Sequence, residues 1–128
     1  MGIYNGHTIQ YLFFIYDKVD NNIITNKLKE NNIYLEIRQN EKTNERYIAL
    51  TILNTTDKRL YESQYYKENY IKWMNDYRTY IKKCNEPIDV NFTEEEQFLL
   101  NKILKTIPFA IEKQGWYDEN DISTTYGL

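Results

Sequence analysis

The sequence predicts an α+β fold, a small three-stranded sheet (strand-helix-strand-strand) packed against one long aromatic helix and a C-terminal helix. Three observations predict it. Residues 8–17 form a nearly continuous apolar run, residues 33–53 contain two stretches of alternating apolar and polar side chains, and residues 56–84 carry aromatic side chains at helical spacing. The length of 128 residues suits one domain, so we expect a single domain over residues 1–128.

The first strand is expected at residues 8–17. Apolar side chains without alternation are typical of a strand that is buried on both faces, and therefore of a central position in the sheet. A short helix is expected over residues 21–30, with Asp20 as its N-cap and with Ile24 and Leu28 facing the core. A strand, a helix and a second strand in this order favour a right-handed parallel crossover.

Two further strands are expected at residues 33–38 and 46–53, where apolar and polar side chains alternate. The polar stretch at residues 39–45 has the length of a hairpin loop, so the two strands should pair antiparallel. This arrangement is close to a truncated ferredoxin-like plait, in which the final helix replaces a fourth strand.

A long helix is expected over residues 56–84, because neither Pro nor Gly interrupts this segment and its aromatic residues recur every three or four positions. The aromatic row consists of Tyr66, Tyr70, Trp73, Tyr77 and Tyr80, followed by Cys84. Rings with polar tips suit surfaces that are partly apolar and partly wet. The row is therefore either a core face or a partner-binding face, and self-association through it would give a homodimer.

The C-terminal helix is expected to begin after Thr93, whose spacing from Glu96 is that of a capping box. Its apolar stripe consists of Leu99, Leu100, Ile103, Leu104 and Ile107. Pro108 should end or kink the helix. Gly115 breaks the chain, and we expect residues 116–128 to form an irregular acidic tail.

The net charge of −3 is unevenly distributed, because residues 57–85 are basic and residues 86–128 are acidic. Internal complementarity between two neighbouring helices explains this better than a binding surface does. The single cysteine cannot form an intramolecular disulfide, and no apolar run approaches the roughly 20 residues of a membrane helix. With no signal-peptide pattern either, we expect a cytoplasmic protein without membrane contact.

No catalytic, cofactor or metal-binding motif is present. His7 is the only histidine, so nucleophile–base chemistry lacks its usual base. The four glycines do not form a phosphate-binding loop, and the acidic runs at 94–96 and 118–121 lack the spacing of a calcium loop. We therefore expect no enzymatic activity, no cofactor and no bound metal.

Tyr16-Asp17-Lys18-Val19-Asp20, at the end of the first predicted strand, resembles the opening of Cas2-like proteins. In that family a strand ends in Tyr-Asp or a similar pair, a helix follows, and the aspartate is implicated in metal-dependent nuclease activity. The resemblance therefore implies such a role for Asp17. It is confined to this segment, because the second predicted strand lacks the polar and aromatic residues of the family, and the helices predicted after residue 53 have no counterpart in it.

Nucleic-acid binding has one supporting observation. Lysines and arginines alternate with tyrosines in residues 56–84, and such residues supply phosphate contacts and stacking. The chain as a whole is acidic, however, which disfavours direct binding of nucleic acid.

We expect instead a small protein-interaction module, because Tyr and Trp are enriched at interfaces and in their hot spots. The dominance of Ile, Asn, Lys and Tyr over Ala indicates an AT-rich genome of a bacterium, phage or mobile element. An inhibitor of the immunity or anti-defence type, which occupies a partner's surface, is the leading hypothesis. A Cas2-like metal-dependent nuclease or nucleic-acid-binding protein is the alternative.

The expected partner-binding residues form two groups. One is the aromatic row of residues 66–80. The other combines two aromatic anchors with negative charge and consists of Glu94, Glu95, Glu96, Trp116, Tyr117, Asp118, Glu119 and Asp121. Negative charge around aromatic anchors selects a basic partner, such as the binding cleft of a nucleic-acid enzyme.

Overall fold

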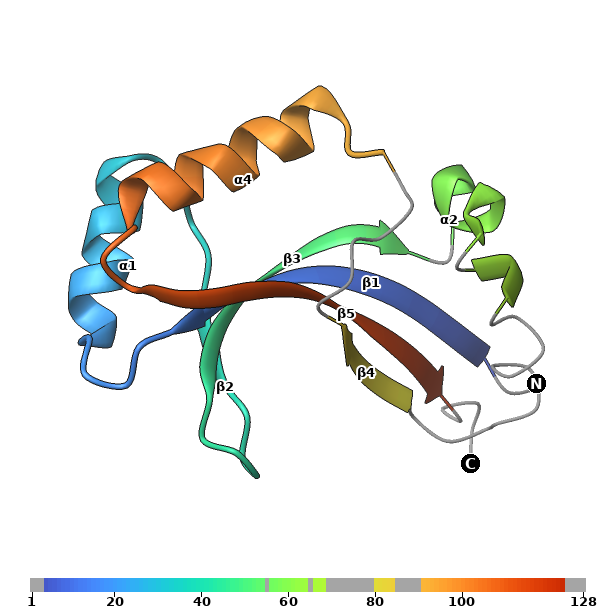
Figure 1. Ribbon diagram of the computed structural model, residues 1–128, viewed down its shortest axis with the longest axis horizontal. Helices are drawn as coiled ribbons and strands as arrows, with labels where there is room; N and C mark the ends of the chain where they lie inside the picture. The colour runs from blue at the N-terminus through green and yellow to red at the C-terminus, as the bar shows by residue number, and fades with distance from the viewer. Residues whose placement is uncertain (1–3, 55, 65, 69–79, 85–90, 124–128) are drawn as a thin grey trace. The chain divides into compact units, whose positions relative to one another are not determined.

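The computed structural model describes residues 4–54, 56–64, 66–68, 80–84 and 91–123 (Figure 1). Within these residues five strands form one antiparallel sheet in the order β2-β3-β1-β5-β4. The strands are β1 (Tyr4–Ile15), β2 (Ile37–Gln39), β3 (Arg46–Asn54), β4 (Tyr80–Cys84) and β5 (Ile111–Ser123). The helices are α1 (Asn21–Glu30), α2 (Lys58–Glu62) and α4 (Glu94–Thr106). The chain is therefore an α+β protein, as predicted, and β1 is a central strand.

The residues divide into two compact units, which are described separately below. The first, called the helical unit, consists of Tyr11–Leu50 and Phe92–Gly115. The second, called the β4 unit, consists of Met1–Gln10, Thr51–Asn91 and Trp116–Leu128. Among the described helices, none has the length and apolarity needed to cross a membrane.

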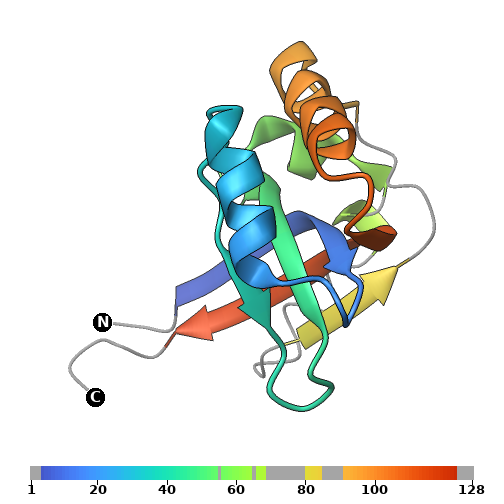
Figure 2. The same cartoon turned by 90° about the vertical axis from the view of Figure 1, so that its left-hand side faces the viewer.

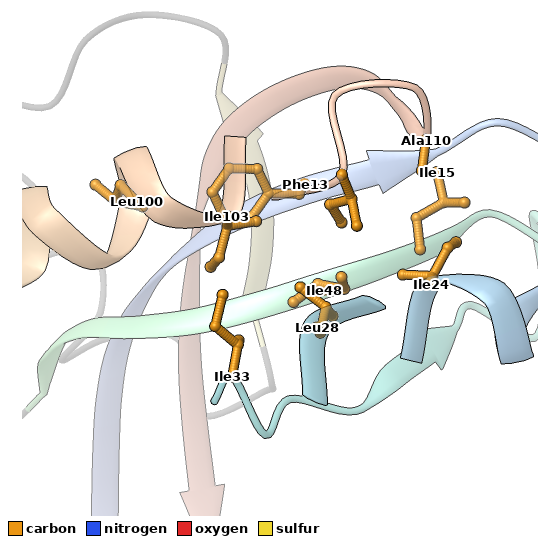
Figure 3. Packing of buried hydrophobic residues seen from close by; sticks show 10 residues of the cluster. Phe13, Ile15, Ile24, Leu28, Ile33, Ile48, Leu100, Ile103 and Ala110 are labelled. Carbon is orange, nitrogen blue, oxygen red and sulfur yellow. The ribbon is translucent and has the colours of Figure 1, made fainter. Parts of the chain in front are cut away.

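In the helical unit, α1 and α4 cover one face of the strands (Figure 2). The buried side chains between the helices and the strands form one core (Figure 3), which consists of Phe13, Ile15, Ile24, Leu28, Ile33, Ile48, Leu100, Ile103, Ile107 and Ala110. The predicted inward pair of α1, Ile24 and Leu28, is part of this core. Full burial of one such side chain stabilises the fold by about 1.5–3 kcal/mol.

Both long helices begin where their caps predict. The backbone N–H of Asn22 donates to Asp20 Oδ1 at 2.7 Å, which satisfies one of the free donors at the start of α1. At α4 the capping box is complete, because the Glu96 N–H donates to Thr93 Oγ1 at 3.1 Å and the Thr93 N–H donates to Glu96 Oε1 at 2.9 Å. The last residue of α4 is Thr106, two positions before Pro108.

In the β4 unit, β4 pairs antiparallel with β5, and the register places Cys84 opposite Trp116 and Lys82 opposite Asp118. Five residues of the basic segment, 80–84, therefore lie beside residues 116–120 of the acidic one, but as two strands and not as the two packed helices that we expected. Among the residues of this unit whose burial the structure describes, the buried apolar ones are Ile9, Ile52, Leu53, Leu60 and Trp116.

The helix predicted over residues 56–84 begins near its expected start, with Asp57 as the N-cap of α2, but it does not continue to residue 84. α2 stops at Glu62, since Ser63 is extended and its Oγ donates to the Leu60 carbonyl oxygen at 2.7 Å. The same Oγ accepts from the Tyr66 N–H at 3.0 Å, so Ser63 serves as a cap on both sides. Residues 80–84 form β4, because pairing with a distant strand overrides a helical spacing of side chains. Residues 69–79 lie outside the described part of the chain.

The irregular tail predicted at residues 116–128 is wrong for residues 116–123, because β5 continues through Gly115 as far as Ser123, and residues 124–128 lie outside the described part of the chain. The strand that was expected to be missing from the plait is therefore present and follows α4. With α2 and β4 set aside, the elements follow the β-α-β-β-α-β order of ferredoxin-like folds. The three-stranded sheet of the prediction gains β4 and β5, and β3 lies between β1 and β2.

The second strand is shorter than predicted, because β2 begins at Ile37 and not at Ile33. The Ile33 N–H donates to the Leu28 carbonyl oxygen at 2.9 Å, which keeps the start of this segment beside the end of α1. Its partner β3 spans the predicted residues and one more.

Candidate partner-binding site

The aromatic row does not form one helical face, because Tyr80 belongs to β4. Tyr66 is half-buried, and its ring makes an edge contact with Tyr61 at a centroid distance of 5.0 Å. The other three members of the row, Tyr70, Trp73 and Tyr77, lie outside the described residues. Whether they bind a partner stays a prediction.

The predicted aromatic anchors near the C-terminus lie in a strand. Trp116 is only 5% exposed and Tyr117 is half-buried, and both belong to β5. Trp116 and Tyr117 are therefore not two exposed anchors that could bind a partner from a flexible tail, because the side chain of Trp116 is buried in the β4 unit. Asp118 and Glu119 lie opposite Lys82 and Ile81 of β4, and Asp121 follows them in the same strand.

The three glutamates at the start of α4 have different surroundings. Glu94 and Glu95 are exposed in the first turn, where negative charge is favourable against the helix dipole. Glu96 is half-buried and completes the capping box with Thr93. Its carboxylate therefore has a structural role that the other two lack.

A hollow of 420 Å³ lies in the helical unit where β1 ends. It is lined by Tyr16, Asp17, Lys18, Val19, Phe109 and Glu112. Two of these side chains are large rings that remain 46% exposed each, Tyr16 and Phe109. We call this surface the Tyr16 hollow.

The backbone explains why two rings so distant in sequence meet at one hollow. The Tyr16 N–H donates to the Ala110 carbonyl oxygen at 3.0 Å, so the end of β1 is fixed beside the turn that carries Phe109. The Val19 N–H donates to the Tyr16 carbonyl oxygen at 3.2 Å and closes a turn over Asp17 and Lys18.

Arg46 at the start of β3 holds this turn from the other side. Its Nη1 donates to the Val19 carbonyl oxygen at 2.7 Å and to Asn21 Oδ1, and its Nη2 donates to the Tyr16 carbonyl oxygen. A planar guanidinium can supply several donors in fixed directions, which a lysine cannot. The turn at the wall of the Tyr16 hollow is thus held by the Arg46 side chain together with the two backbone hydrogen bonds.

Sequence reasoning did not identify the Tyr16 hollow. It named Asp17 only for its resemblance to a nuclease and did not name Phe109. The available signal was weak, since one ring directly follows the apolar run at residues 9–15 and the other follows Pro108. No local sequence pattern shows that Tyr16 and Phe109 lie close together in the fold.

On the face of the strands opposite α1 and α4, the ring of Phe14 is not available for stacking of a base. Phe14 of β1 is 5% exposed, with Lys113 Nζ 4.8 Å from its ring centroid and the Tyr47 ring at a centroid distance of 6.2 Å. Lys113 in turn forms an ion pair with Glu45 at 3.1 Å. Stacking on a nucleic-acid base requires a free ring face, which Phe14 does not present.

Carboxylates are sparse around the hollow. In the described ranges no group of three or more His, Cys, Asp or Glu residues is placed to hold a metal ion. Asp17 and Glu112 do line the same hollow, however. No protein-family model, no curated protein and no solved structure matches this chain.

Proposed function

We propose that this chain is a small protein-interaction module that binds a partner protein at the Tyr16 hollow. Inhibition by occupying the partner's surface, as immunity and anti-defence proteins do, is the mode of action that we propose. The observation that supports it is the pair of half-exposed rings, Tyr16 and Phe109, at one concave surface. Aromatic side chains at such places supply most of the binding energy of many interfaces.

The construction of the hollow supports the proposal further. Its wall is held by Arg46 through main-chain carbonyl groups, so binding need not order a loose loop. Rigid sites avoid part of the entropy cost of association, which is about 0.5–1.5 kcal/mol for each side chain that must be immobilised. A preformed hollow with two aromatic rings is therefore suited to recognition.

The charges at the hollow indicate the partner. Asp17 and Glu112 contribute two negative charges and Lys18 one positive charge. The balance favours a partner segment that carries one basic residue beside an apolar side chain. This agrees with the basic partner, such as a nucleic-acid enzyme, that the sequence led us to expect.

The proposal can be tested with the tagged protein as bait in a lysate of the source organism. The double variant Tyr16→Ser/Phe109→Ser removes both rings, and Phe98→Ser removes a ring of α4 that is 67% exposed and does not line the hollow. We expect the wild type and Phe98→Ser to capture the same partner and the double variant to lose it.

The captured partner then allows a quantitative test. Loss of a hot-spot ring costs 2 kcal/mol or more, so each single variant at Tyr16 or Phe109 should weaken binding by about 30-fold. Circular dichroism controls for folding of each variant. Equal affinity of all variants would show that the partner binds elsewhere on the chain.

One observation favours the alternative, a Cas2-like metal-dependent nuclease. Asp17 and Glu112 line one hollow, and Mg²⁺ is often held by one or two protein carboxylates with water and substrate phosphates completing its shell. The two carboxylates thus fit the minimum for such an ion. Labelled single- and double-stranded DNA and RNA, incubated with Mg²⁺ or Mn²⁺, test it. Cleavage that Asp17→Asn abolishes would establish the nuclease, and intact substrates with wild-type protein would eliminate it.

The homodimer through residues 56–84 was expected to use a continuous helix. α2 and β4 occupy the two ends of that segment, so a dimer would need another surface of the segment. Light scattering over a range of concentrations tests it directly. A mass that stays at 15.6 kDa would exclude the dimer.

A further inference from the structure

β2 lies at one end of the strand order and pairs on one side only, with β3. The register places Ile37 opposite Ile48, Arg38 opposite Tyr47 and Gln39 opposite Arg46. The other edge of a terminal strand carries backbone N–H and C=O groups without a strand partner. Such an edge is a template for the addition of another strand.

The segment that leads into β2 extends this edge. In the part of the chain that the structure describes, Tyr34, Leu35 and Glu36 take no part in backbone–backbone hydrogen bonds. The last such bond before β2 is that of the Ile33 N–H. The backbone groups of these residues that point away from β3 can therefore pair with an incoming chain.

A groove of 520 Å³ runs along this free edge. One wall consists of Asn21, Thr25 and Lys29, which are four residues apart and so form one line along α1. The other wall is residues 33–37. Figure 2 shows α1 beside the chain that leads into β2. We call this surface the β2 groove.

The two walls of the β2 groove have nearly the same length. Eight residues of an α-helix span about 12 Å, which is the length of the line from Asn21 to Lys29. Four residues of an extended chain span about 13 Å, which is close to the same value. The β2 groove therefore accommodates about four residues of an extended peptide between the helix and the strand edge.

Side chains of the edge define what the peptide must carry. Leu35 and Ile37 are half-buried and pack against the core, whereas Glu36 and Arg38 are exposed and therefore lie on the other face. A peptide strand beside this edge would place its apolar side chains next to Leu35 and Ile37. It would place a basic residue opposite Glu36 and an acidic residue opposite Arg38. Tyr34, which is 73% exposed, lines the same groove.

We infer that the β2 groove binds an extended segment of a partner protein, which adds to β2 as an antiparallel strand. The segment alternates apolar residues with one acidic and one basic residue, in that order along its chain. Main-chain hydrogen bonds supply affinity, and the alternate side chains supply specificity. The groove is a different surface from the Tyr16 hollow, so this inference does not rest on the proposed function.

A labelled peptide, acetyl-Gly-Ile-Asp-Ile-Lys-Ile-Gly-amide, is a direct probe, with binding measured by fluorescence anisotropy. Its matched control is the same peptide with Asp and Lys exchanged, which would place like charges opposite Arg38 and Glu36 in antiparallel pairing. We expect the first peptide to bind at least tenfold more tightly. In the full-length variant Glu36→Arg/Arg38→Glu the preference should reverse.

Two further arms separate strand addition from other binding. A peptide with N-methyl groups at alternate positions keeps its side chains but loses backbone donors, and it should bind at least tenfold more weakly. Thr25→Trp places a ring in the groove from α1 and should block the peptide, while Tyr16→Ser/Phe109→Ser should bind it like the wild type.

The outcomes that overturn the inference are distinct. Equal affinity of the N-methyl peptide would mean that no strand is added. Equal affinity of the two charge orders would remove the role of Glu36 and Arg38. A free protein that is a dimer in light scattering, and that Thr25→Trp converts into a monomer, would show that a second copy of this chain occupies the edge.

Discussion

Arg46 Nη1 donates to the carbonyl oxygen of Val19 at 2.7 Å, and the two residues are 27 positions apart in the chain. The contact joins the start of β3 to the turn between β1 and α1. Since the same guanidinium also reaches the Tyr16 carbonyl oxygen, one side chain holds the turn at two of its backbone groups. A main-chain carbonyl accepts these bonds, so the identity of the turn residues matters less than the presence of the arginine.

Arg46→Ala should lower the free energy of unfolding by about 2–4 kcal/mol, because hydrogen bonds to charged groups contribute about 1.5–3 kcal/mol each and the variant loses those from Arg46 to the turn. Arg46→Lys should recover less than half of this, since an ammonium lacks the planar fork. Urea denaturation measures the change. Arg38→Ala, an exposed arginine of β2, is the matched control and should stay within about 0.5 kcal/mol of the wild type.

Trp116→Ala should destabilise the protein by about 3–5 kcal/mol, the range for removal of a large buried aromatic side chain. Trp116 is 5% exposed in β5. Phe98→Ala, on the exposed side of α4, removes a ring of similar chemistry and should cost less than about 0.5 kcal/mol. Similar melting temperatures for the two variants would mean that Trp116 is not part of an interior.

Thr93→Ala should lower stability by about 1 kcal/mol, because the first turn of α4 loses the acceptor for the Glu96 N–H. Thr93→Ser retains the hydroxyl and should lose at most a few tenths of a kcal/mol. Thermal unfolding followed by circular dichroism distinguishes the two. A Thr93→Ser variant as unstable as Thr93→Ala would indicate that the methyl group, and not the cap, matters.

Asp57 gives the protein a defined sensitivity to acid. Burial raises the pKa of its carboxyl, but hydrogen bonds from the Arg59 side chain and backbone, together with the positive charge, outweigh this, so the pKa lies below 3.8. A lowered folded-state pKa means that the stabilisation is present above the unfolded value and is lost as the pH falls through the folded value.

Asp57→Asn keeps a capping side chain but removes the charge, so it should cost about 0.5–1 kcal/mol at pH 7. The difference from the wild type should shrink as the pH is lowered below about 4. Urea unfolding at pH 7, 5 and 3 measures it. A difference that grows on acidification would contradict the sign of the pKa shift.

The elements predicted correctly carry their signals within a few residues. Asp20 and Thr93 mark the starts of α1 and α4, and the apolar run at residues 9–15 marks β1. β4 and β5 carry no such signal, because they become strands by pairing with residues far away in the sequence: β4 pairs with β5, and β5 also pairs with β1. The pairing of Cys84 with Trp116 is invisible to any local pattern, and helical spacing of tyrosines favoured a helix there.

The candidate sites follow the same rule. Tyr16 and Phe109 meet because the Tyr16 N–H bonds to Ala110, a contact between distant parts of the chain. The β2 groove exists because residues 33–36 precede β2 and line the groove with α1 without being part of a strand, although their alternation is that of a strand. Alternation identified the residues that face the core but not where pairing with β3 begins.

The neighbouring positions of β1 and β5 have a consequence for how the protein is made. Tyr11 Oη donates to Gln114 Oε1 at 3.0 Å, across 103 residues of sequence. At about 5–20 residues per second, a ribosome needs about 5–20 s to deliver β5 after β1 has emerged. Throughout that interval one side of an apolar central strand has no neighbour and can pair with other chains. The nascent polypeptide before β5 has been made is therefore more exposed to aggregation than the folded protein, and the demand for chaperones should fall once β5 has paired with β1.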